Sequence, residues 1–361
     1  MTQEIEITQS MLQEVAAPVP ETMEGALDDE WLSLALAHLS GGRKVASVEL
    51  ADIVKAMAAK VRVAVTFDGQ PETVYRLCIK GFLDFDLGAD AGGITTLREA
   101  DFYTKIAPRI TMRTPPCVAS VVDREAVRCI LIMSDMIAAG VHFYNALEPL
   151  TVDQVAETLD QLARLHARPE LLEGNDWIPR RIDELTTRPP HISWEKIQSL
   201  MHDERRADLP DRTLDARLLK RGMEVLAEEG NRLPRTVLHG DCHPGNVYRT
   251  AEGRLGFTDW QLVHQGHWAL DVAYHIASVL PIEVAEKEER VLLNHYLDAV
   301  KKHGGETMER EAAWLAYRRS PVYGYYHWAI TQRVDPPITH QAFKRLGASV
   351  TRHDSYTLLG L

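Results

Sequence analysis

The sequence predicts an α+β fold of two lobes, a β-rich lobe followed by a mainly helical lobe. A chain of 361 residues exceeds what one hydrophobic core usually fills, which favours two folding units. Apolar and polar residues alternate in the stretches before about residue 137, whereas apolar residues recur at helical spacing beyond it. We therefore expect an acidic, loosely attached N-terminal arm over 1–28, a first lobe over 29–137 and a second lobe over 138–361.

Two helices and two hairpins are expected in the first lobe. Residues 28–39 are typical of a helix, because acidic residues occupy the first turn and two glycines follow the end. Apolar residues three apart predict a second helix over 95–107. The paired strands are expected at 61–67 with 73–82 and at 117–123 with 128–136.

The second lobe is expected to consist of helices around one small sheet. Thr151 and Gln154 have the spacing of a capping box, which predicts a helix start at this point. Further helices are expected near 211–229, 283–303 and 308–330. The strands of the small sheet are expected at 235–241, 246–250 and 255–260.

Composition and charge exclude several classes of protein. The formal net charge of −12 argues against a nucleic-acid partner, because such proteins need basic surface to displace counterions from phosphates. The four cysteines form no CxxC pair, so neither a zinc site nor a disulfide framework is expected. The first ten residues do not read as a signal peptide, and no apolar stretch approaches the ~20 residues of a membrane-spanning helix. We expect a reduced, cytoplasmic protein without a membrane span, of open oligomeric state.

The most informative stretch is VLHGDCHPGNVYRTAEGRLGFTDWQ, residues 237–261. Asp241 follows a predicted strand, Asn246 opens the next one and Asp259 closes the third. Because the two ends of a hairpin lie side by side, we expect Asn246 and Asp259 to converge, with Asp241 close to them. Oxygen ligands of this kind, few in number, suit Mg²⁺, which takes its other ligands from water and phosphates. The third oxygen group is left to orient a hydroxyl and accept its proton.

The order of these residues meets the needs of phosphoryl transfer, which relies on positioning and on charge neutralisation. Protein kinases separate the catalytic Asp from a metal-binding Asn by four residues, as Asp241 and Asn246 are separated here. Lys80 lies in an apolar strand, and Glu99 lies on the helix that follows it. We expect these two side chains to form the ion pair that holds a phosphate-binding lysine.

At these motifs the chain resembles the aminoglycoside phosphotransferase and choline kinase superfamily. HGDCHPGN followed by TDWQ looks like the HGDxHxxN loop and the Asp-Trp or Asp-Phe metal motif of that superfamily. LREADFYTKIAPRI, LIMSDMIAAGVHF and GHWALDVAYHIA are similar in arrangement to its ecdysteroid-kinase-like branch. The resemblance implies a protein-kinase-like bilobal fold. It also implies an ATP-dependent small-molecule kinase that uses Mg²⁺.

The resemblance implies a role for each residue of the candidate site. Asp241 would be the catalytic base, and Asn246 and Asp259 would be the Mg²⁺ ligands. Lys80 would bind phosphate, and Glu99 would pair with it.

Further candidate residues surround the nucleotide and the catalytic loop. By the same likeness, Asp271 would be a buried support of the loop. We interpret His239 as a loop brace and His243 as either a brace or a phosphate contact. The backbone groups that would receive adenine belong to Ser134, Asp135 and Met136.

Two other functions stay open at the level of the sequence. A metal-dependent hydrolase would leave Lys80 and Glu99 without a role. Its ligands would be His239, Asp241, His243 and Asp259. A catalytically impaired kinase-like protein is favoured by the segment 53–63, which contains no glycine where a turn over the nucleotide is expected.

The acceptor is expected to be a small-molecule alcohol, because the segment 261–268 leaves little room for a protein-docking activation segment. The aromatic run 323–328 is interpreted first as core. Together with Trp314 and the branch likeness, it nevertheless favours a bulky apolar alcohol over an aminoglycoside.

Overall fold

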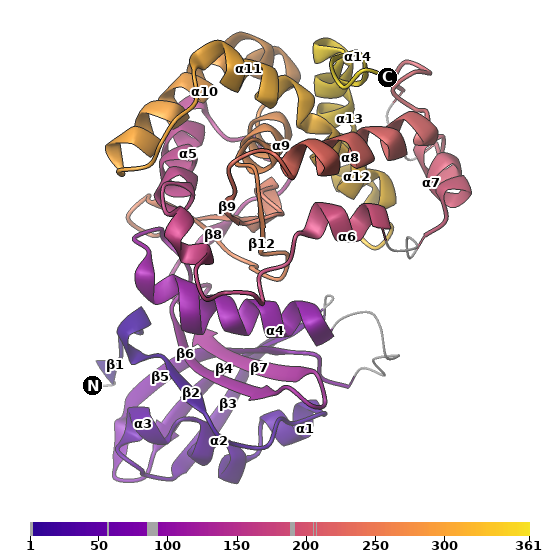
Figure 1. The fold of residues 1–361 in the computed structure, drawn as a ribbon. Coiled ribbons are helices and arrows are strands. Elements are labelled where there is room, and N and C mark those ends of the chain that lie inside the picture. Colours follow the sequence, from indigo (N-terminus) through magenta and orange to yellow (C-terminus); the bar gives the residue numbers. More distant parts are fainter. Residues whose placement is uncertain (1–2, 56–57, 85–92, 188–191, 205, 207) are drawn as a thin grey trace. The chain divides into compact units, whose positions relative to one another are not determined.

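The computed structural model describes the chain except for residues 1–2, 56–57, 85–92, 188–191, 205 and 207. The chain divides into two compact units. The first unit comprises Met1–His142, Arg249–Arg254 and Thr258–Leu262, and the second comprises Phe143–Tyr248, Leu255–Phe257 and Val263–Leu361. The predicted α+β class is confirmed, because the first unit is built on a mixed sheet and the second is mainly helical (Figure 1).

The first unit is organised around a sheet with the strand order β2-β6-β7-β5-β4-β3, in which β1 also pairs with β5. Its strands are β1 (Gln3–Glu4), β2 (Gln13–Val15), β3 (Val45–Lys55), β4 (Ala59–Phe67), β5 (Gln70–Gly81), β6 (Cys117–Asp123) and β7 (Arg128–Ser134). Alternate residues of these strands form one hydrophobic core with α2 (Asp29–Ala35). Two short helices flank α2, namely α1 (Met23–Ala26) and α3 (Ala37–Ser40).

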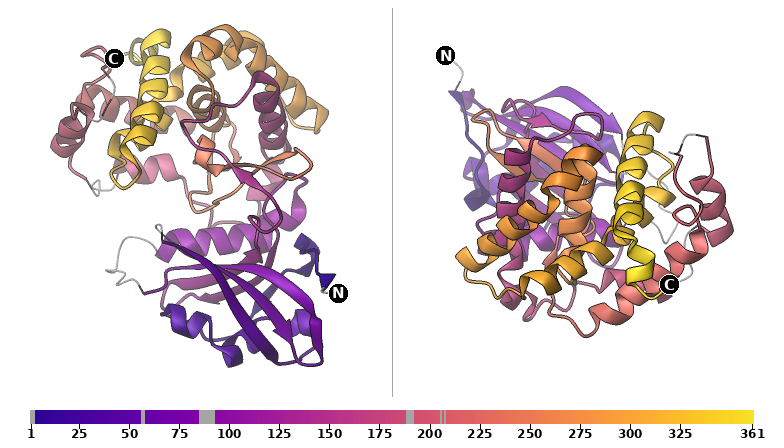
Figure 2. Two further views of the ribbon diagram at one scale, coloured as in Figure 1. Left: turned by 180° about the vertical axis from the view of Figure 1, so that it is seen from behind. Right: turned by 90° about the horizontal axis from the view of Figure 1, so that it is seen from above.

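Helix α4 (Gly93–Asp101) covers the other face of this sheet (Figures 1 and 2). A π-helical turn over Phe102–Ile106 extends it. Ile79 of β5 packs in the core beside α2. Because successive side chains of a strand point to opposite faces, Lys80 points towards the face that α4 covers.

Two features of the first unit differ from the expectations. Strand β3 was not expected, because it lies at the sheet edge and most of its side chains are exposed, which weakens the apolar pattern. The expectation of a loosely attached arm over 1–28 is corrected by β1 and β2, which pair in parallel with β5 and β6. Ile7 between them is buried in the core.

In the second unit, α5, α10, α11, α12 and α13 pack against the central helix α9 (Ala269–Val279), all of whose residues are buried. The other helices of this unit are α5 (Val152–His166), α6 (Arg181–Thr187), α7 (Trp194–Met201), α8 (Ala216–Gly230), α10 (Ile282–Lys302), α11 (Arg310–Arg319), α12 (Pro321–Ile330), α13 (Pro336–His353) and α14 (Ser355–Leu358). The capping box of Thr151 and Gln154 at the start of α5 is confirmed. The helix expected over 308–330 is divided into α11 and α12, with Pro321 at the start of the second.

The short strands of the second half form two groups instead of one small sheet. One sheet has the order β11-β10-β8, with β8 at His142–Phe143, β10 at Val247–Arg249 and β11 at Leu255–Phe257. Strand β9 (Thr236–Leu238) pairs in antiparallel fashion with β12 (His264–Gly266). The expectation that the strand before Asp241 joins the other two strands is therefore wrong.

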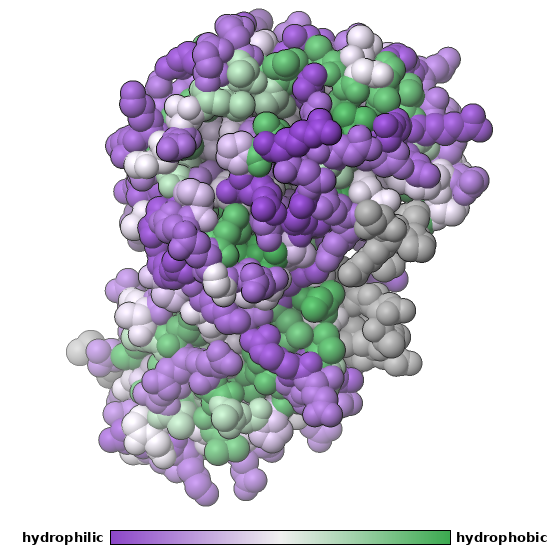
Figure 3. Space-filling view, in the orientation of Figure 1, coloured by the Kyte–Doolittle hydropathy of each residue, from purple (hydrophilic) through white to green (hydrophobic). Residues whose placement is uncertain are grey.

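None of the helices in the described part combines the length and apolar composition needed to cross a bilayer. The face drawn in Figure 3 is mainly hydrophilic, with its apolar side chains in separate patches.

The buried histidine of α9 predicts a pH-dependent stability. Burial lowers the pKa of His275 to about 4, although the Cys242 carbonyl and Asp271 favour the charged form. In an unfolded chain, histidine titrates near ~6.5, so below this pH the unfolded state binds a proton that the native state excludes. The stabilisation is thus complete above pH ~6.5 and is lost as the pH falls towards about 4, by up to ~1.4 kcal/mol per pH unit.

Denaturant unfolding between pH 7 and pH 4 checks this expectation. The His275→Gln variant keeps hydrogen-bonding capacity but cannot take up the proton, so its free energy of unfolding should depend less steeply on pH. Equal pH dependence in the variant and the wild type would show that His275 does not titrate on unfolding.

Candidate active site

A buried ion cluster occupies the first unit. Lys80 Nζ lies 2.7 Å from Glu99 Oε2 and 3.2 Å from Asp259 Oδ1. The side chains of Lys80 and Glu99 are 6% and 2% exposed, whereas that of Asp259 is 31% exposed. The expected ion pair between Lys80 and Glu99 is therefore present, with a second carboxylate beside it.

The segment that carries Asp259 is anchored to α4 and its extension. The backbone amide of Trp260 donates to Glu99 Oε1 at 3.2 Å. The Trp260 indole stacks on the Phe102 ring, with 3.7 Å between ring centroids and 6° between the planes. Asp259 adopts a left-handed backbone conformation with φ of 65°, which is uncommon for a residue with a Cβ. The surrounding contacts hold this conformation, and such backbone outliers are enriched at functional sites.

The charge of Lys80 is set by its two carboxylate neighbours. Burial by itself lowers the pKa of an ammonium group, but Asp259 and Glu99 outweigh this effect and raise the pKa of Lys80 above its ordinary value. The lysine is therefore positively charged and fixed in position. A cation of this kind is suited to bind a phosphate oxygen.

The residues expected to receive adenine lie at the end of β7. The backbone amides of Ser134 and Asp135 already donate to other backbone carbonyls at 2.9 and 3.0 Å. The Asp135 carboxylate accepts from Arg62 Nε at 2.9 and 3.0 Å. Among these three described residues, the backbone amide of Met136 is therefore the one that can donate to a ligand.

Within the glycine-free segment 53–63, where a turn over the nucleotide was expected, residues 56–57 lie outside the described residues.

In the second unit, a buried carboxylate of α9 holds the loop that follows β9. Asp271 accepts hydrogen bonds from the amide of His239 at 2.7 Å and from the amide of Gly240 at 2.9 Å. Gly240 has a φ of 84°, so a side chain at this position would strain the backbone. Asp271 thus shapes the loop directly before Asp241.

The Asp241 carboxylate is held by hydrogen-bond donors. The Tyr274 hydroxyl donates to Asp241 Oδ1 at 3.0 Å, and Trp328 Nε1 donates in turn to the Tyr274 oxygen at 2.8 Å. Asn246 Nδ2 donates to the backbone oxygen of Asp241 at 2.9 Å and contacts Oδ2 at 3.3 Å. The carboxylate therefore has a fixed orientation.

A neighbouring histidine favours the ionised form of this carboxylate. Burial alone would raise the pKa of Asp241, but the interaction with His243, whose Nε2 lies 3.5 Å from Oδ2, lowers the pKa below its ordinary value. Asp241 is therefore an anion at neutral pH. It can accept a hydrogen bond from a hydroxyl group.

Both loop histidines also brace the backbone. His239 Nδ1 accepts the amide proton of Asp241 at 3.2 Å, and His243 Nδ1 accepts that of Gly245 at 3.0 Å. These bonds agree with the interpretation of both residues as braces.

Tyr274 and Trp328 were not expected from the sequence to contact the catalytic residues. Their side chains are almost fully buried, and the run 323–328 is part of the core, as first interpreted. One signal was available. Tyr274 follows Asp271 by three residues, which places both on one side of α9, and a buried tyrosine needs a partner for its hydroxyl.

The donor groups fit a magnesium ion better than a zinc-type site. Among the described residues, no group of three or more His, Cys, Asp and Glu side chains is arranged to hold a metal ion. Asn246 uses its amide nitrogen towards Asp241, which leaves its oxygen as a possible ligand. The convergence of Asn246 and Asp259 stays a prediction.

The chain is similar to known phosphotransferases in sequence and in fold. A profile of the phosphotransferase enzyme family matches residues 94–314. The curated proteins give no match. Among solved structures, the microcompartment-associated aminopropanol kinase is 13% identical, with a TM-score of 0.52 and coverage of 86% of this chain and 92% of that chain.

Two further solved structures have lower TM-scores. Choline kinase LicA from Streptococcus pneumoniae is 14% identical, with a TM-score of 0.48 and coverage of 90% of this chain and 98% of that chain. The ethanolamine kinase of Plasmodium vivax is 15% identical, with a TM-score of 0.49 and coverage of 89% and 87%.

The family match spans more than half of the chain and includes most of the candidate site. It begins in α4, which carries Glu99, and ends in α11, so it contains Asp241, Asn246 and Asp259. The ecdysteroid-kinase-like branch stays a prediction. The match shows that this chain belongs to the phosphotransferase enzyme family.

Proposed function

We propose that the protein is an ATP-dependent kinase that transfers the γ-phosphoryl group to a hydroxyl of a small molecule. The observation that carries this proposal is the Asp241 carboxylate, which is ionised and held in one orientation on the loop after β9. The Lys80 cluster provides a fixed cation for a phosphate oxygen. Membership of the phosphotransferase enzyme family supports the same conclusion.

In this proposal Asp241 positions the acceptor and takes up its proton. The Tyr274 hydroxyl donates to Asp241 Oδ1 at 3.0 Å. The contacts of Asp241 Oδ2 with Asn246 and His243 are longer, at 3.3 and 3.5 Å. Oδ2 therefore accepts the hydroxyl proton. The acceptor oxygen bonds to the γ-phosphorus, the bond from that phosphorus to the bridging oxygen breaks, and ADP leaves.

The lowered pKa of Asp241 makes it a weak base, which suits this chemistry. In a loose transition state, the bond to the attacking oxygen is only partly formed, so the proton leaves late. Orientation of the hydroxyl then matters more than basicity. The relay from Trp328 through Tyr274 supplies that orientation.

The nucleotide and metal are assigned to the remaining candidate groups. We assign a phosphate oxygen to Lys80 and adenine to the amide of Met136. Asn246 Oδ1 and the Asp259 carboxylate would hold Mg²⁺, because their hard oxygen atoms match this ion. Mg²⁺, when bound, neutralises charge on the transferring phosphates.

For the acceptor, we propose a bulky apolar alcohol in preference to an aminoglycoside. Among the described residues, the side chains that contact the Asp241 carboxylate are Tyr274, Asn246 and His243, and none of them is acidic. An aminoglycoside carries several ammonium groups that need carboxylate partners. Turnover of steroid-like or terpenoid alcohols in competition with kanamycin tests the choice, and preference for kanamycin would reverse it.

A thermal-shift comparison tests the nucleotide assignment. ATP with Mg²⁺ should raise the melting temperature more than ATP with EDTA, because a ligand that binds only the folded state stabilises it. Equal shifts with and without Mg²⁺ would support the catalytically impaired alternative.

The Asp241→Asn variant should lose turnover and keep nucleotide binding. The amide has the shape of the carboxylate but cannot accept the proton, so kcat should fall by ~10²–10⁴-fold. Steady-state kinetics with ATP and an alcohol acceptor measure the effect. The exposed Asp176→Asn variant serves as the matched control, and wild-type turnover in Asp241→Asn would remove the residue from the mechanism.

The Asp259→Asn variant should lose the Mg²⁺ dependence of ATP binding. It removes a hard anionic ligand and one of the two carboxylates beside Lys80. Calorimetric titration with ATP at several Mg²⁺ concentrations measures the effect, with the exposed Asp68→Asn variant as control. An unchanged Mg²⁺ dependence would assign Asp259 a purely structural role.

A further inference from the structure

A pocket of ≈ 310 Å³ lies in the second unit, and none of its lining residues belongs to the catalytic groups. It is formed by α6, α8, α11 and β12 with the segments next to them. Its volume lies at the lower end of the range for small-molecule sites, about 300–1,000 Å³. The pocket can therefore hold one compact ligand.

One part of the lining is apolar. The apolar side chains come from α8 and its following segment, from the start of α9 and from α11. They include Leu226, Leu233, Leu270, Met308 and Leu315. Leu315 is 38% exposed in this structure. A ligand that covers this apolar surface would lower the free energy of the complex. The lining thus favours a ligand with an apolar body.

The charged part of the lining is mainly cationic. It contains four arginines against one carboxylate, Glu229, in a protein whose formal net charge is −12. The arginines are Arg180, Arg232, Arg235 and Arg319. Such an excess of positive charge around an apolar wall complements an anion.

Two of these arginines form ion pairs, Arg180 with Asp183 at 2.9 Å and Arg319 with Glu229, but donors remain for a ligand. Arg319 pairs with Glu229 at 3.1 Å, yet its Nε is buried and has no hydrogen-bond partner in the described part of the chain. Arg235 donates to the neutral Gln265 at 2.8 Å. The guanidinium of Arg232 has no ion-pair partner among the described residues. Guanidinium groups bind carboxylates and phosphates with paired hydrogen bonds.

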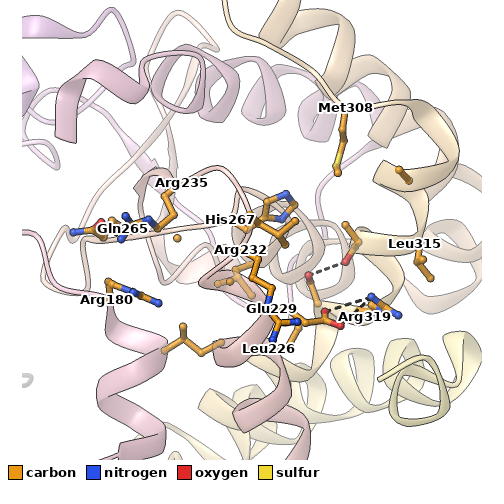
Figure 4. A pocket seen from close by; sticks show the side chains of 18 residues that line it. Arg180, Leu226, Glu229, Arg232, Arg235, Gln265, His267, Met308, Leu315 and Arg319 are labelled. Atoms are coloured by element: carbon orange, nitrogen blue, oxygen red, sulfur yellow. Dashed lines mark hydrogen bonds and ion pairs between the residues drawn. The ribbon is translucent and has the colours of Figure 1, made fainter. Parts of the chain in front are cut away.

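The polar and apolar groups are distributed so that one ligand can contact both. Figure 4 shows Arg180, Arg235 and Gln265 at one end of the pocket and the Glu229–Arg319 pair at the other, with Arg232 between them. Met308 and Leu315 lie on the α11 side.

We propose that this pocket binds a small amphipathic anion, with a carboxylate or phosphate head group on the arginines and an apolar body against the leucines. The site is separate from the proposed catalytic site and does not depend on it.

Calorimetric titration of the full chain tests the proposal. The probes are octanoate and octyl phosphate, with octyltrimethylammonium as the cation of matched chain. Both anions should bind with a submillimolar Kd, and the tighter of the two identifies the preferred head group. The cation should not bind measurably. No heat with either anion, or equal affinity for the cation, would overturn the proposal.

Variants locate the binding. Arg232→Gln removes an exposed cation that holds no structural ion pair, and should weaken anion binding about fivefold or more. Ala312→Phe adds a ring from an exposed helix position into the pocket and should abolish binding. Arg217→Gln on α8 lies outside the pocket and should change nothing.

Asp241→Asn should also keep the wild-type affinity for the probes, which separates this test from that of the catalytic proposal. Wild-type affinity in both Arg232→Gln and Ala312→Phe would show that the anions bind elsewhere.

Discussion

The conformation of the loop before Asp241 depends on one buried carboxylate that binds two backbone amides. Asp271 is fully buried, and it accepts from the amides of His239 and Gly240. Burial would raise the pKa of this group, but the hydrogen bond with His166 and the nearby histidines lower it, so the carboxylate stays ionised. Loss of such a group would leave two buried donors unsatisfied. The loop before Asp241 therefore has one conformation, which α9 imposes.

The same helix also orients Asp241 itself. Tyr274 lies one turn after Asp271, and its hydroxyl connects the Asp241 carboxylate to Trp328 of α12. A buried polar network of this kind is costly unless every member is paired, and here each bond satisfies the next group. The first unit uses the same principle on Lys80, whose charge is retained in a buried position because two carboxylates contact it. The Asp241 carboxylate and the Lys80 ammonium group are thus each held in position by contacts within their own unit.

The sequence predicted those parts of the site that depend on spacing along one element or between neighbouring elements. The ion pair of Lys80 with Glu99 follows from a strand and the helix after it. Pairings between elements that lie far apart in the sequence were harder to predict. A three-residue strand such as β9 is too short to show an alternation of apolar and polar residues from which its partner β12 could be identified. The edge strand β3 is mostly exposed, so its apolar alternation is weak. Tyr274 was missed because a buried aromatic is read first as core.

The proposed transfer of the γ-phosphoryl group to an alcohol can be observed directly by ³¹P NMR. The protein, ATP, Mg²⁺ and a pool of apolar alcohols should produce a new phosphate-monoester signal together with an equal amount of ADP. ADP with inorganic phosphate in place of the monoester, or intact ATP with every alcohol class including aminoglycosides, would contradict it.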